Sequence, residues 1–225
     1  MSLDTVVSTI GDPFQTSAGL QGIFRVLLDA MARPGTIRSL PSLDENAPSP
    51  ATTGMAAVAQ TLLDHEVTFT VVPSAVAADP EASSAFVAYI RSVTGCREDA
   101  LFEADYVFAL GTLPAGLAAD LKRGQPAYPD EGATLVSLVP SLDGATGITV
   151  HLSGPGVPPG TIARIPGWSA DDLASLAEAN AAAPLGIDVI LVDSTGRLMC
   201  LPRSTRISAG NADQTQEVAN GLHRG

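Results

Sequence analysis

The side chains best suited to chemistry lie close together near the end of the chain. Asp188 is followed by Arg203 and Arg206, with Ser204 and Thr205 between the two arginines. Guanidinium and hydroxyl groups together can bind an anionic oxygen array through charge-assisted hydrogen bonds. The same groups can instead form a structural ion pair at a sheet edge, or a patch at a subunit interface.

A predicted β-hairpin positions Asp188. The segments 187–192 and 198–201 are short apolar runs rich in strand-forming residues, and the sequence DSTG between them supplies the glycine that hairpin turns favour. Both faces of the first segment are apolar except at Asp188, so we expect both to be covered. A carboxylate there must lie at the rim of the sheet or meet a donor, and Pro202 favours an edge.

The register of this hairpin decides which side chain meets Asp188. If Asp193 pairs with Gly196, Asp188 and Arg203 are diagonal neighbours on one face, whereas a slip of one residue separates them. We predict that Asp188 anchors the end of a central strand and holds an arginine, either Arg203 or Arg25 of the first predicted helix.

That helix carries two further arginines. Apolar residues recur at helical spacing between residues 15 and 33, and the pattern stops at Pro34. Arg25, Asp29 and Arg33 recur every four residues beside the apolar stripe, which is typical of a solvated face with ion pairs between successive turns. Arg25 and Arg33 are nevertheless candidate anion-binding or subunit-interface residues. The other candidates for these roles are Asp188, Arg203, Thr205 and Arg206.

Helices and strands alternate along the rest of the chain. We predict helices at 52–65, 80–95, 113–124 and 169–182, and strands at 67–72, 105–111, 133–139 and 147–154. The last two strands are predicted to form a hairpin, and 125–132 a loop. This order predicts an α/β three-layer sandwich with a mixed sheet, parallel where helices cross over and antiparallel at the hairpins.

Length and composition indicate one soluble domain. A chain of 225 residues with 45% apolar residues can bury a sizeable core, and its net charge of −12 argues against nucleic acid and anionic membranes as partners. We expect one α/β domain over 1–208 and a polar tail over 209–225. Cys96 and Cys200 match no metal spacing and indicate a reducing compartment, and neither a signal peptide nor a membrane span is visible, so we expect a cytoplasmic protein.

Several common chemistries have no support in the motifs. The segment GPGVPPG at 154–160 has prolines where a phosphate-binding loop needs backbone N–H groups. The three histidines show no zinc-ligand spacing, and no GxSxG motif marks a nucleophile. Lys122 is the only lysine, and it lies in a polar segment unsuited to a Schiff base with pyridoxal phosphate (PLP). We therefore expect neither a metal nor a bound cofactor.

The segments that carry these residues also resemble a known family. FRVLLDAMARPGTI at 24–37, PDEGATLVSLV at 129–139, LSGPG at 152–156, PLGIDVILVD at 184–193 and LPRSTRI at 201–207 occur in this order. Together they resemble the PhnH subunit of bacterial carbon-phosphorus lyase, the system that uses organophosphonates as a phosphorus source. The resemblance covers most of residues 12–208.

The resemblance implies a fold, partners and an activity. From the resemblance we expect a fold similar to the large domain of PLP-dependent transferases, without the cofactor, and a homodimer. We also expect the chain to join the G, I and J subunits in a complex that, with the L subunit, replaces adenine of ATP by a phosphonate to give a ribose 1-phosphonate 5-triphosphate. The J subunit later breaks the carbon-phosphorus bond by radical chemistry, and this chain lacks the cysteine cluster that such chemistry needs.

Two kinds of role fit these observations. In the first, the chain is a structural and regulatory subunit whose arginine-rich edge organises its partners, and it is not catalytic alone. In the second, it contributes residues that bind the triphosphate or the phosphonate. The alternative to both is a stand-alone anion- or nucleotide-binding transferase or hydrolase of unknown substrate.

Overall fold

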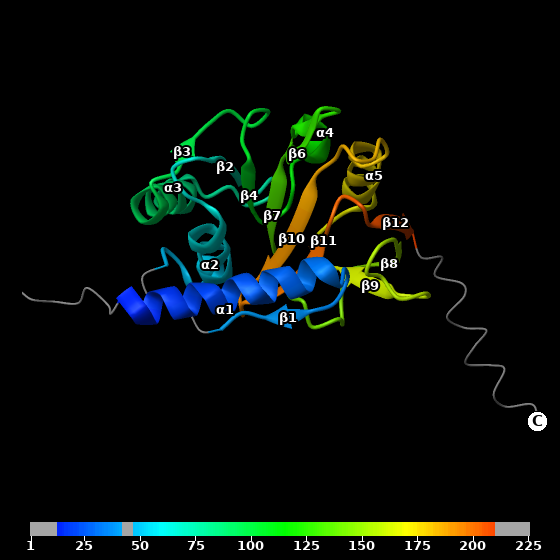
Figure 1. Cartoon of the computed structure of the whole chain (residues 1–225), viewed down its shortest axis with the longest axis horizontal. Helices are drawn as coiled ribbons and strands as arrows, with labels where there is room; N and C mark the ends of the chain where they lie inside the picture. The colour runs from blue at the N-terminus through cyan, green and yellow to red at the C-terminus, as the bar shows by residue number, and fades with distance from the viewer. Residues whose placement is uncertain (1–12, 42–46, 210–225) are drawn as a thin grey trace, which may run out of the picture.

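The computed structural model describes residues 13–41 and 47–209, and its largest element is a seven-stranded sheet (Figure 1). The order across this sheet is β1-β11-β10-β7-β4-β2-β3. Its strands are β1 (Arg38–Ser39), β2 (Thr68–Pro73), β3 (Arg97–Glu98), β4 (Tyr106–Leu110), β7 (Thr134–Val139), β10 (Asp188–Asp193) and β11 (Arg197–Leu201). The pairs from β10 to β3 are parallel, whereas β11 runs antiparallel to both β10 and β1. The prediction of a mixed α/β sheet is confirmed.

Helices cover both faces of the sheet and make a three-layer arrangement. One face packs against α1 (Pro13–Ala32), α2 (Thr53–Leu62) and α3 (Pro80–Thr94), and the other against α4 (Leu117–Asp120) and α5 (Ala170–Ala179). A short 3-10 turn, η1 (Pro50–Thr52), leads into α2. No helix of the described ranges is long and apolar enough to cross a membrane.

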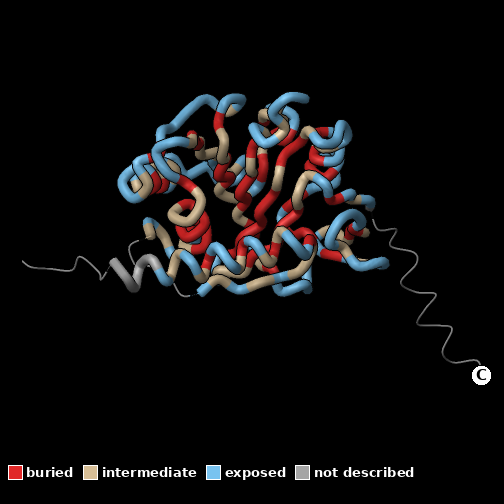
Figure 2. Tube along the Cα trace, in the orientation of Figure 1, coloured by how far each residue is buried: buried red, intermediate tan, exposed pale blue. Residues whose placement is uncertain are grey.

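The core consists of two apolar clusters separated by the sheet. Along β10, Val189 and Leu191 belong to the cluster under α4 and α5, whereas Ile190 and Val192 belong to the cluster under α1, α2 and α3. All four side chains are fully buried, and Figure 2 shows the burial concentrated along the central strands. The expectation that this strand is covered on both faces is confirmed.

One predicted hairpin is wrong because its two strands join different sheets. The predicted hairpin of 133–139 with 147–154 does not form. Strand β7 is apolar on both faces and joins the central parallel sheet, whereas the next strand has only one covered face. That strand, β8 (Ile148–Ser153), pairs instead with β9 (Ile162–Ile165) and β12 (Arg206–Ala209) in a separate sheet.

The predicted loop at 125–132 is also wrong. This segment belongs to a small hairpin of β5 (Arg123–Gln125) and β6 (Tyr128–Gly132). The predicted helix at 113–124 is reduced to the four residues of α4, and the chain enters β5 at Arg123. The predicted tail, apart from Ala209 at the end of β12, lies outside the described residues.

The predicted helix ends are confirmed where local chemistry sets them. The Ser169 hydroxyl caps α5 by accepting a hydrogen bond from the Asp172 N–H, and the Asp172 carboxylate accepts one from the Ser169 N–H, which makes a capping box. Gly95 ends α3 in the left-handed conformation, with φ of 71°, which glycine adopts without steric cost.

The carboxyl end of β10 is fixed by a fully buried carboxylate, that of Asp193. The Asp193 carboxylate accepts bonds from the backbone N–H groups of Leu142, Thr195 and Arg197, at 2.9 to 3.0 Å. The Thr195 hydroxyl and the Arg197 guanidinium add two more. Burial raises the pKa of Asp193, but these bonds outweigh burial and hold the pKa below its ordinary value.

Replacing Asp193 by Asn should lower the free energy of unfolding by about 3 kcal/mol, because several buried donors lose a charged acceptor. Urea denaturation at pH 7 measures this loss. Because the folded-state pKa is lowered, this stabilisation is present above about pH 4 and is lost as pH falls further, so the difference between wild type and variant should shrink in acid. Asp130→Asn, at an exposed carboxylate of β6, is the control and should change little. Equal stability of both variants would contradict the role of Asp193.

Candidate functional site

Asp188 opens β10 at the amino edge of the parallel strands, where it binds Arg203. The Asp188 carboxylate accepts bonds from the Arg203 backbone N–H at 2.7 Å, from Nε at 3.1 Å and from Nη2 at 2.6 Å. Both side chains are mostly buried, with exposed fractions of 23% for Asp188 and 19% for Arg203. The predicted pairing with Arg203 is therefore present, and Arg25 lies elsewhere, exposed on α1.

The pairing forms by a different route from the predicted one. The hairpin register pairs Val189 with Leu201, one residue away from the register that makes Asp188 and Arg203 diagonal neighbours. In this register a continued β11 would carry Arg203 to the other face of the sheet. Instead β11 ends at Leu201 and the chain turns, with the Thr205 N–H bonded to the Pro202 carbonyl. This turn brings Arg203 back to Asp188.

Arg203 also holds the β5–β6 hairpin in place. Its Nη1 donates to the Pro129 carbonyl at 2.5 Å and its Nη2 to the Gly132 carbonyl at 3.3 Å. A side chain at Gly132 would collide with the Arg203 guanidinium and with the Gly186 carbonyl. With four bonds made by its five N–H groups, the guanidinium has little capacity left for an external anion.

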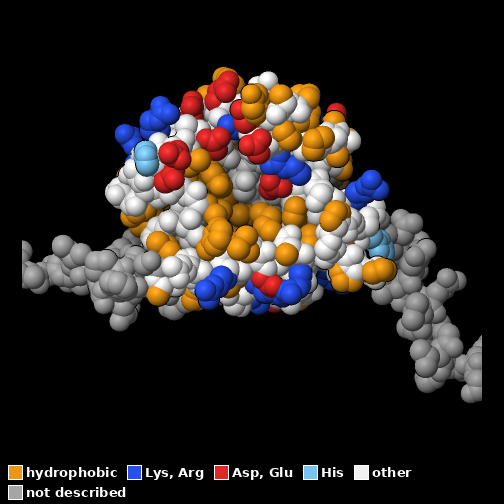
Figure 3. Space-filling model, viewed as in Figure 1, with side chains coloured by type: hydrophobic (Ala, Val, Ile, Leu, Met, Phe, Trp, Pro, Cys, Tyr) orange, Lys and Arg blue, Asp and Glu red, His pale blue; other side chains and the backbone are white. Residues whose placement is uncertain are grey.

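We refer to the contact between Asp188 and Arg203 as the clamp. A row of polar side chains crosses the sheet beside it. The register places Tyr106, Thr134 and Asp188 side by side on the face that α1, α2 and α3 cover elsewhere. Burial raises the pKa of Tyr106, and the charges of Asp105 and Asp188 raise it further, so its phenol stays protonated. In Figure 3, charged side chains gather along the upper rim of this face and apolar side chains lie between that rim and α1.

The remaining candidate residues do not join this cluster. Arg33 forms an ion pair with Asp29, as the helical spacing predicted, and Arg38 of β1 pairs with the same carboxylate. Arg206 is exposed on β12. Thr205 is buried, and its hydroxyl has no hydrogen-bond partner among the described residues.

A second location, at the opposite edge of the sheet, follows no motif in the sequence. A cavity of about 320 Å³ lies where the parallel strands end, lined among others by Ser74 after β2, Gly111 after β4, Pro140 after β7 and Ser194 after β10. Open α/β sheets bind ligands at such carboxyl ends, next to the point where successive crossovers diverge. The signal that could have found it is the presence of hydroxyl residues within two positions of several predicted strand ends, such as Ser74, Thr112 and Ser194.

The two cysteine thiols and the only lysine amine are held in forms unsuited to nucleophilic attack. Burial raises the pKa of the Cys96 thiol to about 11 and that of Cys200 to about 12, so neither is a thiolate near neutral pH. The Lys122 ammonium is paired with Asp105 at 2.5 Å. Among the residues that the structure describes, no three His, Cys, Asp or Glu side chains could hold a metal ion.

The fold and these sites define an α/β protein in which Asp188 and Arg203 join neighbouring segments of the chain, whereas Arg25 and Arg206 are exposed on its surface. The model of a family described as bacterial phosphonate metabolism protein (PhnH) matches residues 13–208, and the chain belongs to this family. It is 31% identical over 189 residues to the alpha-D-ribose 1-methylphosphonate 5-triphosphate synthase subunit PhnH of Rhizobium meliloti (strain 1021). That match covers 83% of this chain and 89% of the relative, so the family predicted from the motifs is confirmed.

Replacing Asp188 by Asn should lower the free energy of unfolding by about 2 kcal/mol, because the charge-assisted bonds to Arg203 weaken. Urea denaturation measures the loss, and Asp130→Asn, at an exposed carboxylate of β6, is the control. Unchanged stability of Asp188→Asn would show that the clamp contributes nothing to the fold.

Replacing Thr205 by Val separates a structural role of this residue from anion binding. Removing a buried, unpaired hydroxyl should leave stability unchanged or raise it by about 1 kcal/mol. Thermal unfolding measures the difference. An anion-dependent stabilisation by phosphate that is present in the wild type and absent from Thr205→Val would instead assign the hydroxyl to an anion site.

Proposed function

We propose that this chain is a non-redox subunit of an assembly that forms a ribose 1-phosphonate 5-triphosphate from ATP and a phosphonate, during organophosphonate catabolism. The observation that carries the proposal is the family match over nearly the whole described chain, together with a relative whose name is that of a subunit of such a synthase. The G, I and J subunits of carbon-phosphorus lyase are the proposed partners, and the chain itself is proposed to be a homodimer.

The proposed role is to organise the assembly, not to carry out the chemical step alone. Arg203 is occupied by Asp188 and two backbone carbonyls, so it supports the fold more readily than it binds a substrate. Both thiols are protonated near neutral pH, which supports a role without covalent or redox chemistry. Free buried cysteines are also what a reducing compartment such as the cytoplasm permits.

The fold similarity to PLP-dependent transferases, without the cofactor, belongs to this proposal. A PLP enzyme requires a free lysine amine to form its aldimine, whereas Lys122 is the only lysine and is paired with Asp105. We therefore propose that the chain binds no cofactor and that ATP is a substrate of the assembly.

One observation favours a second function, the stand-alone binding of a small ligand. The cavity at the carboxyl ends of the parallel strands, called here the carboxyl-edge cavity, lies where open α/β sheets bind ligands. Among the described residues, its lining contains no charged side chain. Calorimetric titration of the purified chain with ATP and with methylphosphonate, each alone, tests it. Binding that is lost when Ser194 is replaced by Trp, a change that fills the cavity, would support the second function.

The proposed function is tested by purifying the tagged chain from its own host, grown on a phosphonate as the sole phosphorus source. Mass spectrometry should recover the G, I and J subunits together with the chain. A homodimer without these subunits would overturn the proposed assembly and favour the stand-alone alternative.

The exposed arginines can be tested in the same purification. The double variant Arg25→Glu and Arg206→Glu should reduce the recovered partner subunits about tenfold, because reversing charges at an interface costs affinity. Arg164→Glu, at another exposed arginine on the sheet that contains β12, is the control and should recover them normally. Equal recovery from both would exclude Arg25 and Arg206 from the interface.

A further inference from the structure

Strand β2 has an open stretch of backbone on its outer edge. In the described chain, β3 pairs only with Thr68 and Phe69 of β2, and the Asp99 N–H donates to the Phe69 carbonyl at 2.9 Å. Because backbone groups alternate along a strand, those of Val71 point to the same outer side as those of Phe69. Strand β3 has ended before it reaches Val71, so no strand of the described chain pairs with Val71 on that side.

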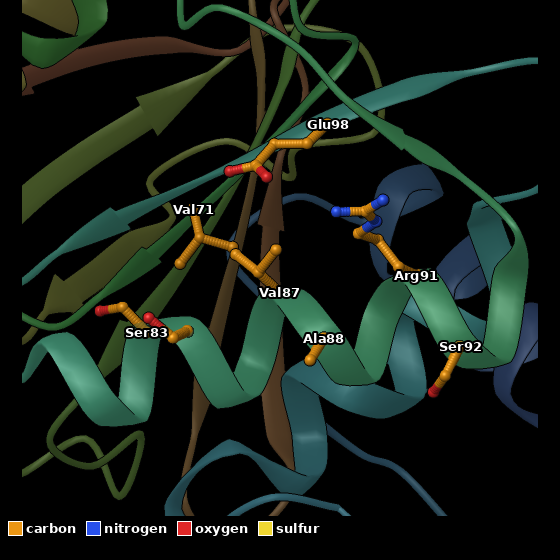
Figure 4. A pocket seen from close by; sticks show the side chains of 8 residues that line it. Val71, Ser83, Val87, Ala88, Arg91, Ser92 and Glu98 are labelled. Carbon is orange, nitrogen blue, oxygen red and sulfur yellow. The ribbon is translucent and has the colours of Figure 1, made fainter.

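A groove of about 730 Å³ runs along this open edge, between β2 and α3. Small side chains of α3 form one wall, which leaves room beside the strand. Figure 4 shows Val71 on the strand side, with Val87 and Ala88 along the helix. The Arg91 side chain lies farther along the helix, and the Glu98 side chain reaches over the groove from the side opposite the helix. The groove is lined by Val71, Ser83, Ser84, Val87, Ala88, Arg91, Ser92 and Glu98.

The groove suits a short extended segment better than a broad sheet. An unpaired strand edge is a template for a further strand, which gains main-chain hydrogen bonds along it. Pro73, the next residue whose backbone faces outward, has no N–H and so limits the ladder to the region of Val71. A few extended residues can therefore pair, with small or β-branched side chains between the strand and Val87.

The charges at one end of the groove favour an acidic occupant. A second hollow adjoins the groove through Arg91 and Glu98 and adds Arg97 to its lining. Both arginines are exposed, and neither belongs to an ion pair within the described part of the chain. The lining of this end therefore carries two guanidinium groups against one carboxylate, on a chain whose net charge is −12.

We propose that the groove between β2 and α3 binds a short extended segment of a partner protein. The segment adds to the open edge at Val71 and places an acidic side chain between Arg91 and Arg97. This inference goes beyond the proposed function, because it concerns a different part of the surface from Arg25 and Arg206 and stands without any particular partner.

Site-specific cross-linking in the native host tests the proposal. A photo-reactive amino acid replaces Ala88, which is exposed in the groove, in the full chain, and mass spectrometry maps the cross-linked peptide. The matched control carries the same group at Ala119, an exposed alanine of α4. We expect an adduct with an Asp- or Glu-containing segment of another protein at position 88 only, and a yield about tenfold lower after Arg91→Glu.

Three results would overturn the proposal. They are an adduct with a second copy of this chain, a yield at position 88 no higher than at position 119, and an adduct that persists unchanged after Arg91→Glu. Circular dichroism of Arg91→Glu checks that the variant is folded, and Arg91→Lys, which keeps the positive charge, should restore most of the yield. If the cross-linking experiment contradicts the groove proposal, the recovery of the G, I and J subunits is unaffected. The two proposals can therefore fail independently.

Discussion

The fold depends on one constraint, a central strand that is covered on both faces and carries a carboxylate at each end. Strand β10 is buried from Val189 to Asp193, so Asp193 cannot rely on water for its hydrogen bonds, and Asp188, whose side chain is 23% exposed, can do so only in part. Each carboxylate is satisfied by an arginine and by backbone N–H groups from the turns beside it. The two acids therefore determine where the turns at both edges of the sheet must lie.

The two carboxylates occupy two arginines that an anion-binding site could otherwise use. Arg203 is bound to Asp188 and to the β5–β6 hairpin, and Arg197 is bound to Asp193 and to the Ser141 hydroxyl. Desolvated charge pairs of this kind are costly to break, so these arginines cannot turn to a ligand without destabilising the sheet. The positive charges that remain available to a ligand or a partner belong to exposed arginines such as Arg25, Arg91 and Arg206.

Local patterns predicted the elements, but not their distant pairings. The helix ends at Gly95 and Ser169 follow from short-range backbone chemistry, which the sequence displays directly. Strand β8 pairs with β9, the next strand along the chain, and also with β12, which is separated from it by more than fifty residues. Local alternation carries no information about such a distant partner.

The contact of Asp188 with Arg203 was predicted for the wrong reason. The residue types were informative, because a carboxylate in an apolar strand needs a donor nearby. The register was off by one residue, and a turn after Leu201 restored the contact. The hairpin at 123–132 was missed because Arg203, some seventy residues later, binds its carbonyl groups.

The chemistry of the carboxyl-edge cavity bears on how a triphosphate could be bound. Its lining is uncharged, the adjoining hollow adds the carboxylate of Asp79, and Arg197 nearby is neutralised by Asp193. A triphosphate brings several negative charges, which need cations or metal ions to replace their hydration. This cavity supplies none from its own lining, so those cations must come from another chain or from a metal ion bound with the nucleotide. A chain whose carboxyl-edge cavity has an uncharged lining, and whose Arg197 and Arg203 are bound within the fold, is therefore better suited to positioning a partner that holds the nucleotide than to holding it alone.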